Sequence, residues 1–179
     1  MVAIPIDKDF APDACLTTFA DSHFFPKEYK LSLGQDVLIL GYPLGFWHDH
    51  TNNLPVIRDG MVASAYPVPY NRNPYFLVTS RLHEGTSGAP VITRPPTRLF
   101  KNDRIEQKEN IRWGRTEEKK KRHKLRNQRF LLGINAATFP FPKGKQKSDM
   151  NAVYFSEIIK EITESKNQRK SQVVSHIFV

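Results

Sequence analysis

Six short segments rich in β-forming residues follow one another between residues 35 and 155, and turns that contain Pro or Gly separate them. Val, Ile, Leu, Tyr, Phe and Thr dominate the segments, while residues such as Pro43, Gly45 and Pro67 interrupt the chain between them. The predicted strands cover about residues 35–42, 54–65, 75–80, 89–94, 129–138 and 151–155. Six antiparallel strands of this length match one Greek-key barrel. We therefore expect an all-β fold built on a six-stranded barrel.

The turn at residues 85–90 has an unusual composition. It reads Gly-Thr-Ser-Gly-Ala-Pro and places Ser87 between two glycines. Acyl transfer needs a hydroxyl presented at a tight bend beside backbone N–H groups, and glycine permits both the bend and the close approach of a substrate. The alternative is an ordinary turn between two strands. We interpret Ser87 as a candidate nucleophile.

The segment from Gly85 to Val91 resembles the Gly-x-Ser-Gly-x-Pro-Val signature of trypsin-like (chymotrypsin-fold) serine peptidases of the bacterial type. Three further segments resemble strands of the same family and occur in the family's order, namely LGQDVLILGYPLG at 33–45, NLPVIRDGMVA at 53–63 and LGINAA at 132–137. An ordered set of motifs is much rarer than any one motif. The resemblance spans roughly residues 33–160 and implies the C-terminal barrel of a two-barrel hydrolase.

The resemblance also implies roles for residues around Ser87. The backbone N–H groups of Gly85 and Ser87 would form the oxyanion hole. An extended peptide substrate would pair with the strand edge at Ala136, Ala137 and Thr138. The wall of the main specificity pocket would include Arg81 and Leu82, and Arg81 together with His83 would favour an acidic side chain there.

Two positions depart from the family pattern. Bacterial relatives often carry Asp near the position of Thr79, and Asn or Asp just before the serine, where this chain has Thr86. The implied pocket therefore lacks the side chains that these relatives carry at both positions.

The residues that would activate Ser87 are missing from the sequence. In this fold the catalytic residues follow the chain order His, Asp, Ser. Residues 2–6 resemble the strand that follows the family's Asp, so this Asp would fall at Met1 or one place before it, and the His further upstream. A serine without a base is a weak nucleophile. We expect the chain as given to be inactive or nearly so, through a truncated reading frame or as a degenerate paralogue.

None of the six histidines is a good replacement for the missing base, and none belongs to a recognisable metal site. His83 lies four residues before Ser87, but no carboxylate is placed to orient it as a base. His48 and His50 are too few for a structural zinc site, which needs about four ligands, and Cys15 is the only cysteine. The remaining histidines, which show no partner pattern, are His23, His123 and His176. We expect neither a metal nor a cofactor.

The chain divides into three parts in this interpretation. Residues 1–34 form a remnant of the first barrel and a connector, in which 7–32 is a loop with one helical turn near 16–20. Residues 35–165 form the second barrel and a C-terminal helix, and residues 166–179 form a tail. The helix is predicted because apolar side chains recur at helical spacing at Phe155, Ile158, Ile159 and Ile162, after which the pattern ends. Ser156 would be its N-cap.

Residues 98–129 contain 13 Lys or Arg and 5 Asp or Glu, a local net charge of +8 out of +9 for the whole chain. The barrel itself is therefore close to neutral, and the excess charge lies in one insertion between two strands. An exposed loop kept in solution by its charge explains this composition. The alternative is contact with nucleic acid, an anionic surface or an acidic protein partner. This alternative defines a second class of function, a non-catalytic binding module.

The cysteine content and the N-terminal segment bear on the cellular compartment. A single cysteine makes no internal disulfide, and the N-terminus has neither the basic stretch nor the apolar run of a signal peptide. No segment approaches the ~20 apolar residues of a membrane span. We expect no membrane span, and the cytoplasm by default.

Overall fold

The computed structural model describes residues 18–44, 49, 51–52, 54–97, 99–101, 125–140 and 147–167. Predictions made for residues 2–6, His48, His50, His123, His176, most of the basic insertion and the last twelve residues lie outside this part of the chain.

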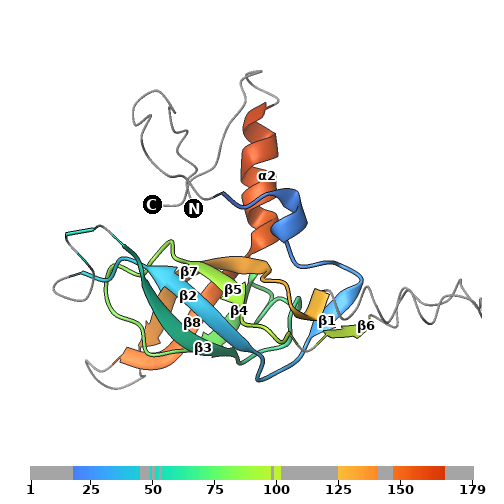
Figure 1. Ribbon diagram of the computed structural model, residues 1–179. Helices are drawn as coiled ribbons and strands as arrows, with labels where there is room; N and C mark the ends of the chain where they lie inside the picture. Colours follow the sequence, from blue (N-terminus) through green and yellow to red (C-terminus); the bar gives the residue numbers. More distant parts are fainter. Residues whose placement is uncertain are drawn as a thin grey trace, which may run out of the picture.

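The chain forms a closed barrel of six antiparallel strands and one long C-terminal helix (Figure 1). Around the barrel the strands follow the order β2-β3-β4-β8-β7-β5, and β5 closes the barrel against β2. Their bounds are β2 Asp36–Gly41, β3 Val56–Val62, β4 Tyr75–Thr79, β5 Pro90–Thr93, β7 Leu131–Pro140 and β8 Lys147–Phe155. All six predicted strands are confirmed. The largest difference is β8, which begins four residues before its predicted start.

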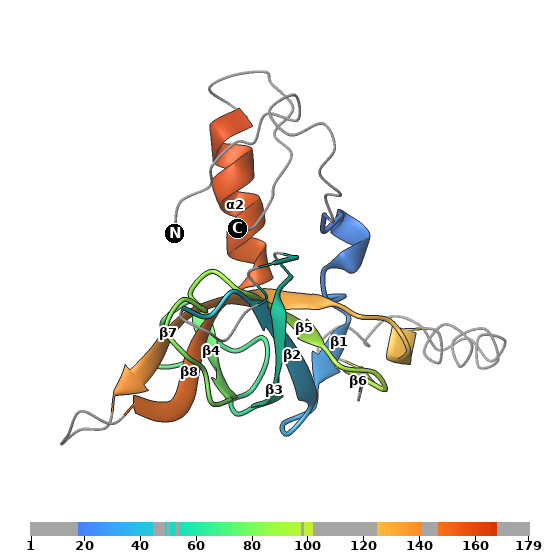
Figure 2. The ribbon, with the colours of Figure 1, turned by 60° about the vertical axis from the view of Figure 1, so that its left-hand side comes forward.

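A second, smaller sheet lies beside the barrel (Figure 2). It pairs β1 (Tyr29–Leu31) with β6 (Leu99–Lys101), which follows β5 in the chain. Both strands have three residues, which is too short for a recognisable alternation of apolar and polar side chains. The connector also contains a 3-10 turn, η2, at Asp21–His23, whereas residues 18–20 of the predicted helical turn are not helical.

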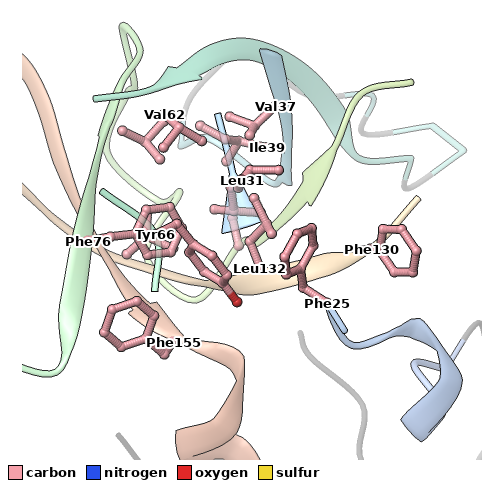
Figure 3. Packing of buried hydrophobic residues seen from close by; sticks show 14 of the residues in the cluster. Phe25, Leu31, Val37, Ile39, Val62, Tyr66, Phe76, Phe130, Leu132 and Phe155 are labelled. Carbon is pink, nitrogen blue, oxygen red and sulfur yellow. The ribbon is translucent and has the colours of Figure 1, made fainter. Parts of the chain in front are cut away.

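The barrel core follows from the period-2 alternation of its strands. Along β2, Val37 and Ile39 point inward and are at most 1% exposed, while Asp36 is exposed to solvent. Aromatic rings close the lower part of the core, as Figure 3 shows. The Phe76 ring stacks on Phe155 with centroids 5.6 Å apart, and Tyr66 packs edge-on against both.

The helix α2 (Ser156–Asn167) continues directly from β8 and covers a second apolar cluster on the outside of the barrel. Ile159 is 7% exposed and packs in this cluster with Ile92, Leu131 and Ile134. Lys160 connects the helix to the segment that carries η2: its ammonium lies 3.0 Å from Asp21 Oδ1 and 4.4 Å from the centre of the Phe24 ring. The predicted helix is thus confirmed with its buried face against the barrel.

No helix among the described residues is long and apolar enough to cross a membrane.

Candidate functional site

The loop that carries Ser87 consists of two consecutive turns that share Thr86. We call residues 83–89 the serine loop. The Thr86 N–H donates to the His83 carbonyl at 3.4 Å, and the Ala89 N–H donates to the Thr86 carbonyl at 3.2 Å. Gly85 and Gly88 occupy the third position of each turn with φ of 90° and 88°, as a type II turn requires. Ser87 is the second residue of the second turn, and its side chain is exposed.

The two N–H groups of the predicted oxyanion hole have fixed orientations, because the carbonyl that shares each peptide plane is held. The Leu44 N–H donates to the Glu84 carbonyl at 2.8 Å, and the Ala89 N–H holds the Thr86 carbonyl. C=O and N–H point in opposite directions across a trans peptide. The N–H of Gly85 therefore points away from the Leu44 N–H, and the N–H of Ser87 points away from the Ala89 N–H. Neither N–H donates a hydrogen bond to another described residue.

Thr86 stabilises the loop from within. Its side chain is 5% exposed, and its hydroxyl donates to the His83 carbonyl at 2.7 Å. The His83 carbonyl therefore accepts two hydrogen bonds from Thr86, one from its N–H and one from its hydroxyl, and both hold the first turn together. The hydroxyl that departs from the family pattern is therefore hydrogen-bonded within the serine loop.

A small pocket of about 60 Å³ lies between the end of β2 and the serine loop. Leu40, Gly41 and Tyr42 form one side, and Gly85, Ser87 and Pro90 lie among the residues of the other. The pocket brings Ser87 next to an apolar hollow that is open to solvent. A small apolar group bound there would lie against the serine loop.

The predicted substrate strand has an open edge. β5 pairs with β7 up to Ile134, whereas β8 pairs with β7 as far as Pro140. The register shifts between Asn135 and Ala137, so Ala136 is the extra residue of a β-bulge. Ala137 is exposed, and Ala136 and Thr138 are half-buried. Beyond Asn135, β7 pairs on one side only within the described chain, which leaves the other side for an added strand.

The predicted pocket wall separates into two environments. Arg81 is exposed, whereas Leu82 is 8% exposed and packs in the main core cluster. Burial in the core accounts for the Leu82 side chain without a substrate. Beneath this segment, Asn151 is fully buried and donates to the Ser80 carbonyl at 2.7 Å, while Thr138 donates to Asn151 Oδ1 at 2.7 Å. Asn151 thus connects the predicted pocket wall to the predicted substrate strand.

No base is hydrogen-bonded to Ser87 within the described residues. His83 lies in the same loop and supplies its carbonyl to Thr86, but its ring makes no hydrogen bond with the Ser87 hydroxyl. The described residues also contain no group of three or more His, Cys, Asp or Glu side chains that could hold a metal ion.

Three residues with a structural role at the site were missed by sequence reasoning: Leu44, Asn135 and Asn151. Leu44 acts through its backbone N–H, for which side-chain identity carries no signal. Asn135 and Asn151 are polar residues inside strand segments, and this position is the available signal, because a buried amide requires hydrogen-bond partners.

The two ends of the basic insertion meet at the barrel. The Thr97 N–H donates to the Arg126 carbonyl at 2.8 Å, and the Thr93 N–H donates to the Phe130 carbonyl at 2.9 Å. The chain therefore leaves and re-enters the barrel at neighbouring points.

Comparison with protein-family models gives no match for this chain. Comparison with curated proteins gives no match either.

Proposed function

We propose that this barrel is the C-terminal barrel of a trypsin-like serine peptidase and that Ser87 is the nucleophile of peptide-bond hydrolysis. The strand order supports the proposal. β2, β3 and β4 are consecutive neighbours, and β5 returns to lie beside β2, which supports a Greek-key connection of the proposed barrel. β7 and β8 then fill the space between β5 and β4.

The fixed N–H groups of Gly85 and Ser87 are the observation that carries the proposal. In acyl transfer, charge develops on the carbonyl oxygen of the substrate, and preorganised N–H donors stabilise it. In the serine loop both preceding carbonyls are held at 2.8 to 3.2 Å by other groups, so the N–H directions are set before a substrate binds. The bond from Ala89 to the Thr86 carbonyl is the usual bond of a β-turn, whereas the bond from Leu44 to the Glu84 carbonyl comes from a separate loop, and an ordinary connecting turn does not need it.

The proposed reaction begins when Ser87 Oγ attacks the carbonyl carbon of a peptide that lies along the open edge of β7. A base takes the hydroxyl proton and passes it to the leaving amine as the C–N bond breaks. Water then cleaves the acyl-enzyme. No such base is hydrogen-bonded to Ser87 within the described residues, so we expect this chain alone to turn over little or no peptide.

Reaction with a fluorophosphonate tests the proposal without requiring turnover. Ser87 Oγ forms a bond to phosphorus, and fluoride leaves. The phosphoryl oxygen of the reagent would accept from the N–H groups of Gly85 and Ser87, and each preorganised oxyanion donor is worth about 10²- to 10³-fold in rate. We therefore expect Ser87 to be modified on the order of 10³-fold faster than Ser22, an exposed serine of η2. Quantitative mass spectrometry of the two peptides gives this ratio.

The Ser87→Ala variant should show no fast labelling, and unfolded chain should label both serines alike. Equal labelling of Ser87 and Ser22 in the folded protein would contradict the proposal. That result would favour the non-catalytic binding module.

A further inference from the structure

Asn135 contacts the serine loop through three separate groups. It lies on β7, and its side chain is 2% exposed. Its backbone N–H donates to the Ala89 carbonyl at 2.9 Å, and its carbonyl accepts from the Gly88 N–H at 2.8 Å. Its side-chain Nδ2 donates to the Thr86 carbonyl at 2.9 Å. The first two contacts would persist with any side chain at position 135, so the third is the contribution of the amide.

The Thr86 carbonyl shares its peptide plane with the Ser87 N–H. Its two donors are Ala89 N at 3.2 Å and Asn135 Nδ2 at 2.9 Å, and the side-chain amide makes the shorter bond. Rotation of this peptide would carry the carbonyl away from Asn135 and turn the Ser87 N–H inward. The Asn135 amide therefore opposes the rotation that would remove one oxyanion donor.

The oxygen of the Asn135 side-chain amide is left without a hydrogen bond within the described chain when its nitrogen donates to Thr86. Asn135 Oδ1 is buried and accepts no hydrogen bond from the described residues. The opposite orientation of the amide would place two oxygens 2.9 Å apart, which is repulsive. The side chain thus leaves a buried acceptor unpaired while it donates to Thr86.

We infer that Asn135 is a positioning residue, which keeps the Ser87 N–H directed outward as an oxyanion donor. The inference rests on the proposed function, and it adds a residue that does not touch the substrate. It also specifies the chemistry at position 135: the side chain must donate a hydrogen bond, and an ionised acid of the same shape cannot do so.

The test is Asn135→Asp, with Gln35→Glu as the matched control. Gln35 is 2% exposed and donates from Nε2 to the carbonyls of Asp36 and Arg94, at the far end of β2 from the serine loop. Each variant replaces a buried amide donor by an acid of the same shape. Thermal unfolding of both variants establishes that they are folded and how far each is destabilised.

Fluorophosphonate labelling then compares Ser87 with Ser22 in each folded variant. Loss of one oxyanion donor lowers the rate by about 10²-fold or more, so Asn135→Asp should reduce the labelling ratio by about this factor at neutral pH. Gln35→Glu should leave the ratio unchanged. At a pH low enough to protonate the introduced acid, its O–H can donate to Thr86, and the ratio should return toward that of the original chain.

The outcomes separate this inference from the proposed function. If Ser87 is not selectively labelled in the original chain, the proposed function fails. If the original chain is selective and folded Asn135→Asp is equally selective, only the role of Asn135 fails. A loss of selectivity that acid does not restore would also overturn the inference, because it would indicate a structural effect of the substitution.

Discussion

Leu44 and Gly85 lie so close together that no side chain fits between them. A Cβ atom at position 85 would stand 2.7 Å from the Leu44 nitrogen and 2.8 Å from the Tyr42 carbonyl oxygen. The same approach allows the Leu44 N–H to hold the Glu84 carbonyl. The loop that follows β2 thus sets the orientation of the Gly85 N–H.

Gly85→Ala should therefore displace the serine loop. The new methyl group would clash with backbone atoms, and alanine is disfavoured at a φ of 90°. We expect the free energy of unfolding to fall by about 2 kcal/mol or more and selective labelling of Ser87 to be lost. Urea unfolding and labelling measure the two effects.

Gly34→Ala is the control for backbone strain. Gly34 also has a positive φ, 71°, but a Cβ atom there would meet no heavy atom within 4 Å. The Gly34→Ala substitution should lower the free energy of unfolding by about 1–2 kcal/mol and leave the selective labelling of Ser87 unchanged. Equal labelling of the two glycine variants would show that the contact with Leu44 does not control the site.

Asn151→Asp should destabilise the barrel strongly. Asn151 Nδ2 faces the carbonyls of Val78, Ser80 and Asp149, and an ionised acid would present an oxygen to them. We expect the free energy of unfolding to fall by about 3 kcal/mol at neutral pH. The decrease should be smaller in acid, because the introduced carboxyl is then protonated. Urea unfolding at two pH values measures it.

Asn73→Asp changes the same group in an exposed residue whose side chain donates one hydrogen bond, to the Asn71 carbonyl. It should cost less than about 1 kcal/mol. Similar losses for both variants would contradict the role given to Asn151.

Tyr66 should make the fold sensitive to alkali. Burial raises the pKa of its phenol far above the ordinary value of 10.0, the charge of Glu157 raises the pKa further, and Ser156 lowers it only in part. The unfolded chain loses this proton near pH 10 while the folded chain retains it, so stability falls as pH rises above 10. Relative to Tyr66→Phe, the original chain should lose about 1.4 kcal/mol per pH unit there.

Below about pH 9 the Tyr66→Phe variant should be at least as stable as the original chain, because the buried hydroxyl that it removes has no hydrogen bond of good geometry among the described residues. Urea unfolding between pH 8 and about pH 11 checks both statements. Parallel stability curves over the whole range would contradict the assignment.

The bond between Thr97 and Arg126 predicts that the barrel folds without most of its basic insertion. Replacement of residues 102–124 by a short Gly/Ser linker should change the unfolding midpoint by less than about 4 °C and leave Ser87 labelling intact. Loss of cooperative unfolding would contradict this prediction. If the insertion binds polynucleotides, the intact chain should bind them in a salt-dependent way and the shortened chain should not.

The barrel strands could be predicted from the sequence because each has a run of β-forming residues with an apolar inward face. The first part of β8 was missed, since Lys147, Ser148 and Asp149 are polar and are placed in the strand by pairing with β7. The bulge at Ala136 is likewise a property of two strands together. The amino-acid composition of a single segment therefore predicts neither the start of β8 nor the bulge.

The serine loop also has some features that could be predicted from the sequence and others that could not. Its glycines and its exposed hydroxyl could be predicted, because turn chemistry is local. The residues that hold its peptide planes come from β7 and from the loop after β2, so Asn135 and Leu44 become visible only when the barrel is closed. Leu82, just before the serine loop, is the opposite case: the family resemblance implied a substrate contact, and the closed barrel places the side chain in the core.

The structure of the phosphonylated chain would test the central claim most directly. We predict phosphorus bonded to Ser87 Oγ, with the phosphoryl oxygen about 3 Å from the backbone nitrogens of both Gly85 and Ser87. An adduct whose oxygen contacts neither nitrogen, or a phosphonyl group on other residues while Ser87 remains free, would contradict it.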